Sequence, residues 1–246
     1  VELRDAYEVV SNSITTVTDP HTSYLSPRKV EDFNIDMSLS LEGIGAVLQR
    51  DDEFTKVVRL VAGGPADKAG DLQASDYIVG VAQDGEAMQE ILGWRLDDVV
   101  DQIRGPKGSL INLQIIPGGD LQQAKKTIQI RRNKVELDDQ AAKKSVIELP
   151  TKEGTRKFGV ITLPTFYMDF AAAKQGDPNY RSSTRDVYEL IQELNEESVS
   201  GIIVDLRNNG GGSLREANQL TGLFIETGTT VQVRYANGVI EKQIDR

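Results

Sequence analysis

Hydrophobic residues recur every three or four positions near the N-terminus, at Leu3, Ala6, Tyr7, Val10, Ile14 and Val17. This spacing places them on one face of a helix over residues 2–17. Asp19-Pro20 ends the pattern, because proline disfavours helical geometry in the residue before it. Ser26-Pro27 predicts a second, short helix that has serine as its N-cap and proline at its first helical position.

Short apolar runs separated by glycine turns replace the helical pattern from residue 39 onwards. They predict strands at 46–48, 56–61, 77–81, 110–116 and 127–130. Two helices are expected between them, at 66–70 and 95–104, and the second is strongly amphipathic. Residues 39–132 are therefore predicted to form a compact, mostly antiparallel β domain with two helices.

The remaining residues, 133–246, read as alternating strands and helices. Strands are expected at 158–163, 202–206 and 231–233, and helices at 186–194 and 214–224, with an exposed loop over 171–183. The run at 202–206 is continuously apolar, as in a buried parallel sheet. The order β-α-β-α-β predicts a layered α/β domain with right-handed crossovers. The fold class is thus α+β with α/β, in segments 1–38, 39–132 and 133–246.

Composition excludes several kinds of site. The net charge of −10 argues against nucleic acid as a partner. The absence of cysteine excludes disulfides and thiolate sites, and a single histidine excludes a multi-histidine metal site, so we expect no metal and no cofactor. No run of 18 apolar residues predicts a membrane span. The first residues already read as the middle of a helix, so we expect the chain to begin inside a longer precursor, without its signal peptide.

The first candidate site is the loop Gly43-Ile44-Gly45. Two glycines around one apolar residue allow successive backbone N–H groups to turn into one concavity that suits a carboxylate. The strand that follows could accept a peptide as an added β-strand, and the helix at 95–104 would form the other wall. The alternative is a plain glycine turn before a strand. The candidate peptide-binding residues are Leu41, Glu42, Gly43, Ile44, Gly45, Ala46, Val47, Leu96, Val100 and Ile103.

The second candidate site is the run Asp205-Leu206-Arg207-Asn208-Asn209-Gly210-Gly211-Gly212. A buried strand that runs through glycines into a helix offers free N–H groups to an anion. Neither a phosphate loop nor a dinucleotide loop fits the spacing. An oxyanion hole built from backbone N–H groups fits, and a tight strand-to-helix turn is the alternative.

Two further matches are interpreted as structural. His21 lies two residues from Ser23, but neighbours in sequence seldom reach catalytic geometry, so a turn between helices is expected there. Ser26-Pro27-Arg28-Lys29 formally matches Ser-x-x-Lys, but the partner motifs of that enzyme class are absent.

The order of motifs from residue 41 to 109 resembles a PDZ domain, a small and partly open β-barrel with two helices. The whole chain resembles the carboxyl-terminal processing proteases of peptidase family S41. The motifs that carry this resemblance are Asp-Pro-His-Thr-Ser-Tyr-Leu at 19–25, Leu-Glu-Gly-Ile-Gly-Ala at 41–46, Gly-Gly-Pro-Ala at 63–66, Gly-Trp-Arg-Leu-Asp-Asp-Val-Val at 93–100, Arg-Gly-Pro-Lys-Gly-Ser at 104–109 and Asp-Leu-Arg-Asn-Asn-Gly-Gly-Gly at 205–212.

The resemblance implies a periplasmic serine endopeptidase of the cell envelope with a Ser-Lys dyad. Its PDZ domain, inserted in the protease domain, would bind apolar C-terminal tails of polypeptide substrates, and an envelope adaptor protein is a further expected partner. The resemblance also implies that the turn at Gly210 and Gly211 lies where the family places one oxyanion donor. The family's Ser-Ala-Ser-rich nucleophile segment and later lysine have no match before Arg246. We therefore expect an inactive part of the protease that lacks its catalytic Ser and Lys. A non-catalytic PDZ scaffold is the alternative. A trypsin-like PDZ protease is set aside, because only about 40 residues precede the PDZ motifs.

Overall fold

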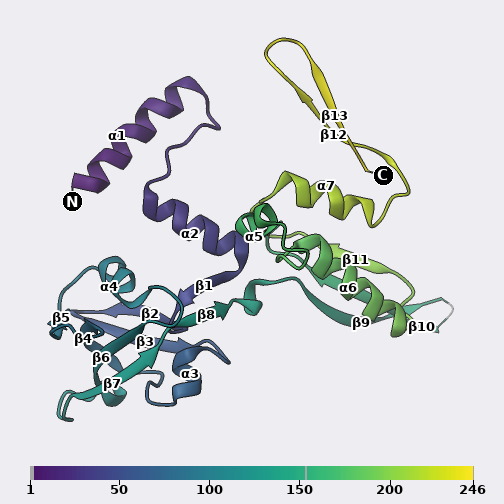
Figure 1. Cartoon of the computed structure of the whole chain (residues 1–246). Coiled ribbons are helices and arrows are strands. Elements are labelled where there is room, and N and C mark those ends of the chain that lie inside the picture. The colour runs from purple at the N-terminus through teal and green to yellow at the C-terminus, as the bar shows by residue number, and fades with distance from the viewer. Residues whose placement is uncertain (1–2, 153, 246) are drawn as a thin grey trace. The chain divides into compact units, whose positions relative to one another are not determined.

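The computed structural model describes residues 3–152 and 154–245. The chain divides into two compact units. We call Ser40–Asp139 the central unit, and Val1–Leu39 together with Gln140–Arg246 the flanking unit. Figure 1 shows the elements of each.

The central unit contains an open antiparallel sheet in the order β2-β3-β4-β6-β7, with β5 paired to β4. Its strands are β2 (Ala46–Asp51), β3 (Phe54–Leu60), β4 (Tyr77–Gln83), β5 (Gln89–Glu90), β6 (Leu110–Ile116) and β7 (Lys126–Arg131). The helices are α3 (Pro65–Ala69) and α4 (Leu96–Ile103), with a 3₁₀ turn, η1, at Pro117–Gly119. Within the described residues, β1 (Ser40–Gly43) pairs only with β8 (Asn133–Glu136), so the sheets do not close into a barrel.

The core of the central unit comes from alternate strand positions and the inner face of α4. Every second residue of β6, at Ile111, Leu113 and Ile115, is buried, as the period of two along a strand requires. Val99 and Ile103 of α4 join the same cluster. The unit reaches Asp139 instead of ending at 132, because β8 returns to pair with β1.

The flanking unit begins with two helices, α1 (Leu3–Thr18) and α2 (Pro27–Ser38). They confirm the predicted helix pair and the turn between them. Asp19 Oδ1 accepts the His21 N–H at 2.6 Å, and the Asn12 side chain bridges to the Tyr24 backbone. α1 contributes no buried residue.

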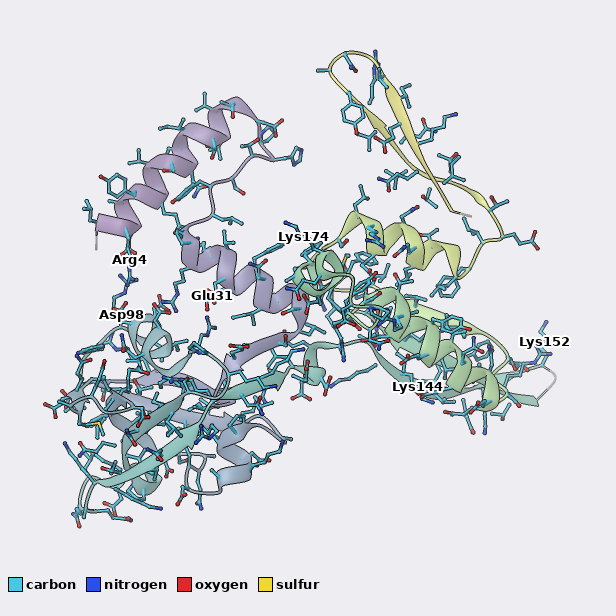
Figure 2. All side chains as sticks on the ribbon, in the orientation of Figure 1. Arg4, Glu31, Asp98, Lys144, Lys152 and Lys174 are labelled. Atoms are coloured by element: carbon cyan, nitrogen blue, oxygen red, sulfur yellow. The ribbon has the colours of Figure 1, made fainter. Side chains whose placement is uncertain are left out.

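The second part of the flanking unit is a three-stranded sheet in the order β11-β10-β9. β9 (Lys143–Thr151) and β10 (Gly154–Thr162) are antiparallel, and β10 and β11 (Ile202–Asp205) are parallel. Between them the chain forms α5 (Phe170–Gln175) and α6 (Ser183–Glu196), then continues as α7 (Leu214–Gly222). A short 3₁₀ turn, η2 (Asp138–Gln140), precedes β9. Lys144 of β9 ties the sheet to α6 through Glu193 and Glu197, at 2.9 and 2.6 Å (Figure 2).

Three expectations for this region are wrong. The segment predicted as a loop contains α5, because Asp169 caps the helix by accepting the Ala172 N–H at 2.9 Å and Gly176 ends it in a left-handed conformation. β12 (Gly228–Arg234) does not extend the parallel sheet, because it forms a hairpin with β13 (Ile240–Asp245). β11 is not buried on both faces, since Ile203 is 44% exposed.

None of the helices in the described ranges combines the length and apolarity needed to cross a membrane.

Candidate functional site

Two carbonyl groups of the loop from Gly43 to Gly45 accept hydrogen bonds from other parts of the central unit. The Ile44 carbonyl accepts the Ala66 N–H at 2.8 Å, and the Gly45 carbonyl accepts the Val61 N–H at 2.8 Å. With the carbonyls turned inward, the N–H groups of Ile44 and Gly45 meet no acceptor among the described residues. Buried N–H groups are rarely left unpaired, so this pair is a ready site for an external acceptor.

Gly45 must be glycine for this arrangement. Its φ is +75°, and a Cβ there would lie 3.3 Å from Gly64 Cα and 3.4 Å from the Val135 side chain. The left-handed backbone is unfavourable for residues with a Cβ, and the space is also taken.

β2 continues the row of donors. The bond from Val61 N–H to Gly45 makes Ala46 and Leu60 a non-hydrogen-bonded pair, so the Ala46 N–H points away from β3. β2 is the last strand on its side of the sheet, and within the described residues its outer edge is unpaired. Three successive N–H groups, those of Ile44, Gly45 and Ala46, are therefore available to an acceptor from outside the described residues.

α4 lies beside β2 and supplies an apolar face. Leu96 and Val100 are half-buried and lie one turn apart. Ile103 is only 4% exposed and belongs to the core, as does Ile44, so neither side chain offers a surface contact. We call the main chain of 44–46, the β2 edge, Leu96 and Val100 the tail site.

The other residues predicted for peptide binding form the frame of the tail site. Glu42 Oε2 accepts the Lys107 N–H at 2.9 Å, and its carbonyl accepts the Gly105 N–H at 3.5 Å, so Glu42 fixes the loop after α4. Leu41 is half-buried, with its Cδ1 3.1 Å from the position of a Cβ on Gly43. Val47 is half-buried and opposite Arg59 of β3.

The glycine turn after β11 lies in the flanking unit and is fastened to the segment after β10. Gly210 N–H donates to the Pro164 carbonyl at 3.2 Å, and Gly211 N–H donates to Asn209 Oδ1 at 2.8 Å. The N–H groups of Gly210 and Gly211 are therefore both engaged within the protein in this conformation. The Gly212 N–H, in contrast, meets no acceptor in the described part of the chain.

Asp205 and Arg207 form a close pair at the start of this turn. Arg207 Nη2 lies 2.7 Å from Asp205 Oδ2, and the Arg207 backbone N–H also donates to Asp205 Oδ1 at 3.0 Å. The Arg207 side chain and backbone hydrogen bonds lower the pKa of the Asp205 carboxyl to about 2.

Within the described residues, the serine and lysine candidates noted from the sequence do not form a dyad at the glycine turn. Ser213 Oγ donates to Met168 Sδ at 3.7 Å and accepts the Glu216 N–H, so it serves as the N-cap of α7. Lys29, in the Ser-x-x-Lys match, pairs with Glu8. Lys242 lies exposed on β13. No group of three or more His, Cys, Asp or Glu within the described ranges is arranged to hold a metal ion.

The buried carboxylate of Glu216 was not singled out from the sequence. Its Oε2 accepts Ser182 Oγ at 2.7 Å, Ser183 Oγ at 3.1 Å and the Thr184 N–H at 2.8 Å. It thus joins the start of α6 to α7, where the positive end of the helix dipole favours a negative charge. Ser213-Leu214-Arg215-Glu216 is a capping-box signal, and it suggests a different partner for this side chain.

The buried guanidinium of Arg132 was also missed. It donates to the carbonyls of Ile103, Gln102 and Leu110, to Ser109 Oγ and to Gln83 Oε1, at 2.8–3.2 Å. Burial lowers its pKa. It holds the end of α4 against β6, and thereby fixes the helix of the tail site.

The chain matches known families in two places. Residues 32–116 match the PDZ domain model, and residues 157–245 match the model of peptidase family S41. A tail-specific protease of Haemophilus influenzae is 40% identical over 94% of this chain and 31% of its own length. A probable CtpA-like serine protease of Staphylococcus aureus is 27% identical over 90% of this chain and 38% of its own.

A solved structure is also similar to part of the chain. The crystallised PDZ domain of a carboxy-terminal protease from Vibrio cholerae, in complex with a peptide, is 49% identical over 40% of this chain and 100% of its own, with a TM-score of 0.39.

The chain spans less than two fifths of the length of the two curated relatives described above. Within that span, residues 32–116 match a PDZ domain and residues 157–245 match peptidase family S41.

Proposed function

We propose that the tail site binds the C-terminal tail of a polypeptide. The observation that carries this proposal is the set of three successive, available N–H groups at Ile44, Gly45 and Ala46, two of them in a buried loop without an acceptor among the described residues. A terminal carboxylate is the acceptor that such a nest suits, and an extended tail would then pair with the edge of β2. The half-buried Leu96 and Val100 favour an apolar last residue.

The whole protein is then a C-terminal processing serine endopeptidase of the bacterial cell envelope. The S41 match supports an enzyme over a non-catalytic scaffold. A Ser-Lys dyad, in which the lysine acts as general base, would cleave the captured polypeptide. Because Ser213 is engaged as a helix cap, we place the nucleophile and its lysine outside residues 1–246. Periplasmic location and an adaptor protein belong to the same proposal.

Fluorescence polarisation with tail peptides tests the binding step. A labelled peptide with an apolar last residue should bind this chain at least tenfold more tightly, about 1.4 kcal/mol, than the same peptide ending in aspartate. Equal binding of the two peptides would show that Leu96 and Val100 do not select the tail. Cleavage of a tailed, unfolded substrate by residues 1–246 alone would contradict the placement of the dyad.

A further inference from the structure

A hollow of about 440 Å³ lies on the central unit between α3, β7 and the loop after α4. None of the residues of the tail site lines it. β7 and β2 are the opposite ends of the sheet, and Figure 1 shows α3 and α4 on opposite sides of the unit. The hollow is therefore a second concave site, separate from the tail site.

The charge of this hollow is of one sign. Its ionisable lining residues are Lys68, Lys107, Arg131, Arg132 and Lys134, and no Asp or Glu lines it. The chain as a whole carries a net charge of −10, so the positive charge of this hollow is opposite in sign to that of the whole protein. Such a concave, single-sign surface attracts the opposite charge.

Three of these cations have no carboxylate partner in the part of the chain that the structure describes. The side-chain amines of Lys68 and Lys107 take part in no hydrogen bond or ion pair among the described residues, and both residues are exposed. Arg131 donates to the Gly108 carbonyl at 2.8 Å, which leaves its charge uncompensated. Lys134 forms an ion pair with Glu136, and Arg132 is buried and donates to neutral acceptors. These two side chains are therefore engaged within the protein.

The main chain beside the hollow favours a polypeptide as the ligand. β7 is the last strand of the sheet, and within the described residues no strand pairs with its outer edge. Gln129, Ile130 and Arg131 of β7 line the hollow directly. An edge strand presents alternating N–H and C=O groups that an extended chain can pair with, and a small anion would use none of them.

We propose that this hollow binds an extended, acidic segment of a polypeptide. The segment pairs along the outer edge of β7, and its carboxylates contact Lys68, Lys107 and Arg131. This proposal stands independently of the tail site, because it needs neither a free C-terminus nor an apolar last residue.

The test uses the 246-residue chain and a labelled peptide of alternating Glu and Thr with an amidated C-terminus, so that the tail site cannot take it. A Lys68→Gln/Lys107→Gln double variant should bind this peptide roughly fivefold to tenfold more weakly. The matched control is Lys56→Gln/Lys125→Gln, which removes two charges of the same unit outside the hollow. The control should bind within about twofold of the parent. Unchanged circular dichroism and Trp94 fluorescence would show that both variants are folded.

Further arms separate the ligand classes. A peptide with Gln in place of Glu should bind weakly, and added salt should weaken binding of the acidic peptide. An unlabelled apolar tail peptide should not displace it, which distinguishes this proposal from the tail site. Equal binding by the two double variants, or displacement by the tail peptide, would overturn the second site. If phosphatidylglycerol vesicles bind and the acidic peptide does not, the ligand of the hollow is a lipid surface and not a polypeptide. This result would also overturn the proposal.

Discussion

Gly45 and Gly63 are a natural pair for testing the tail site at the scale of one residue. Their φ angles are +75° and +71°, so alanine meets similar backbone strain at both, about 1–2 kcal/mol. A Cβ at Gly63 meets nothing within 4 Å, whereas one at Gly45 meets Gly64 and Val135. We expect Gly45→Ala to weaken tail-peptide binding about tenfold or more and Gly63→Ala to change it less than about threefold. Equal losses of peptide affinity in the two variants would mean that binding does not depend on the backbone conformation of Gly45.

Asp205 gives a prediction for pH. Its pKa is lowered to about 2 by Arg207, so the stabilisation from this pair is fully present above the unfolded pKa of about 4 and is lost as the pH falls towards 2. A carboxyl titration by ¹³C NMR should show the low pKa in the parent and a value near 4 in Arg207→Ala. Arg215→Ala, an exposed arginine on α7, should leave it unchanged. If the pKa of Asp205 stays low in Arg207→Ala, Arg207 is not the cause of its low value.

Arg132 gives a prediction for stability. Arg132→Met removes all donors from a buried cluster of carbonyl and side-chain oxygens, and we expect a loss of about 3 kcal/mol in the free energy of unfolding of the central unit. Trp94 is the only tryptophan and lies in this unit, so its fluorescence during urea unfolding measures the change. A loss below about 0.5 kcal/mol would mean that water replaces the guanidinium without cost.

At the scale of elements, Glu216 joins two helices. Glu216→Ala leaves Ser182, Ser183 and the Thr184 N–H without their acceptor, so we expect a loss of about 2–3 kcal/mol in the stability of the α6–α7 junction. Amide hydrogen exchange should show faster exchange at Thr184 and the first turn of α6, with β2 to β7 unchanged. If exchange at the start of α6 stays slow in this variant, the carboxylate is not what fixes the junction.

Elements with a local signal were predictable from the sequence. The predicted strand at 110–116 coincides with β6, and the helix predicted at 95–104 contains α4 (Leu96–Ile103), because both carry a clean hydrophobic period. β8 was missed because its partner, β1, lies far away in the chain. β9 pairs with the next strand, β10, but was missed because its residues do not alternate cleanly. The β12–β13 hairpin did have a signal, the turn residues Asn237-Gly238, but it was not used.

The same distinction applies to the candidate sites. The glycines at 43 and 45 marked the tail site, because few residues tolerate such a turn. Whether the N–H groups of a glycine turn are free depends on partners far along the chain. Val61 and Ala66 take the carbonyls of the first loop and leave its N–H groups free, whereas Pro164 and Asn209 occupy the donors of Gly210 and Gly211. Spacing alone could not separate these two outcomes.

At the scale of the whole molecule, the protein combines a PDZ unit with an unpaired edge at β2 and a unit that matches part of peptidase family S41. The central claim is that the N–H groups of Ile44, Gly45 and Ala46 take a C-terminal carboxylate. The most direct measurement is a ¹⁵N-¹H NMR titration of the chain with an apolar tail peptide, carried out with a free and with an amidated C-terminus. Large downfield shifts at Ile44, Gly45 and Ala46 with the free peptide, and their absence with the amidated one, are the predicted result. Equal shifts with both peptides, or shifts confined to residues outside this loop, would contradict it.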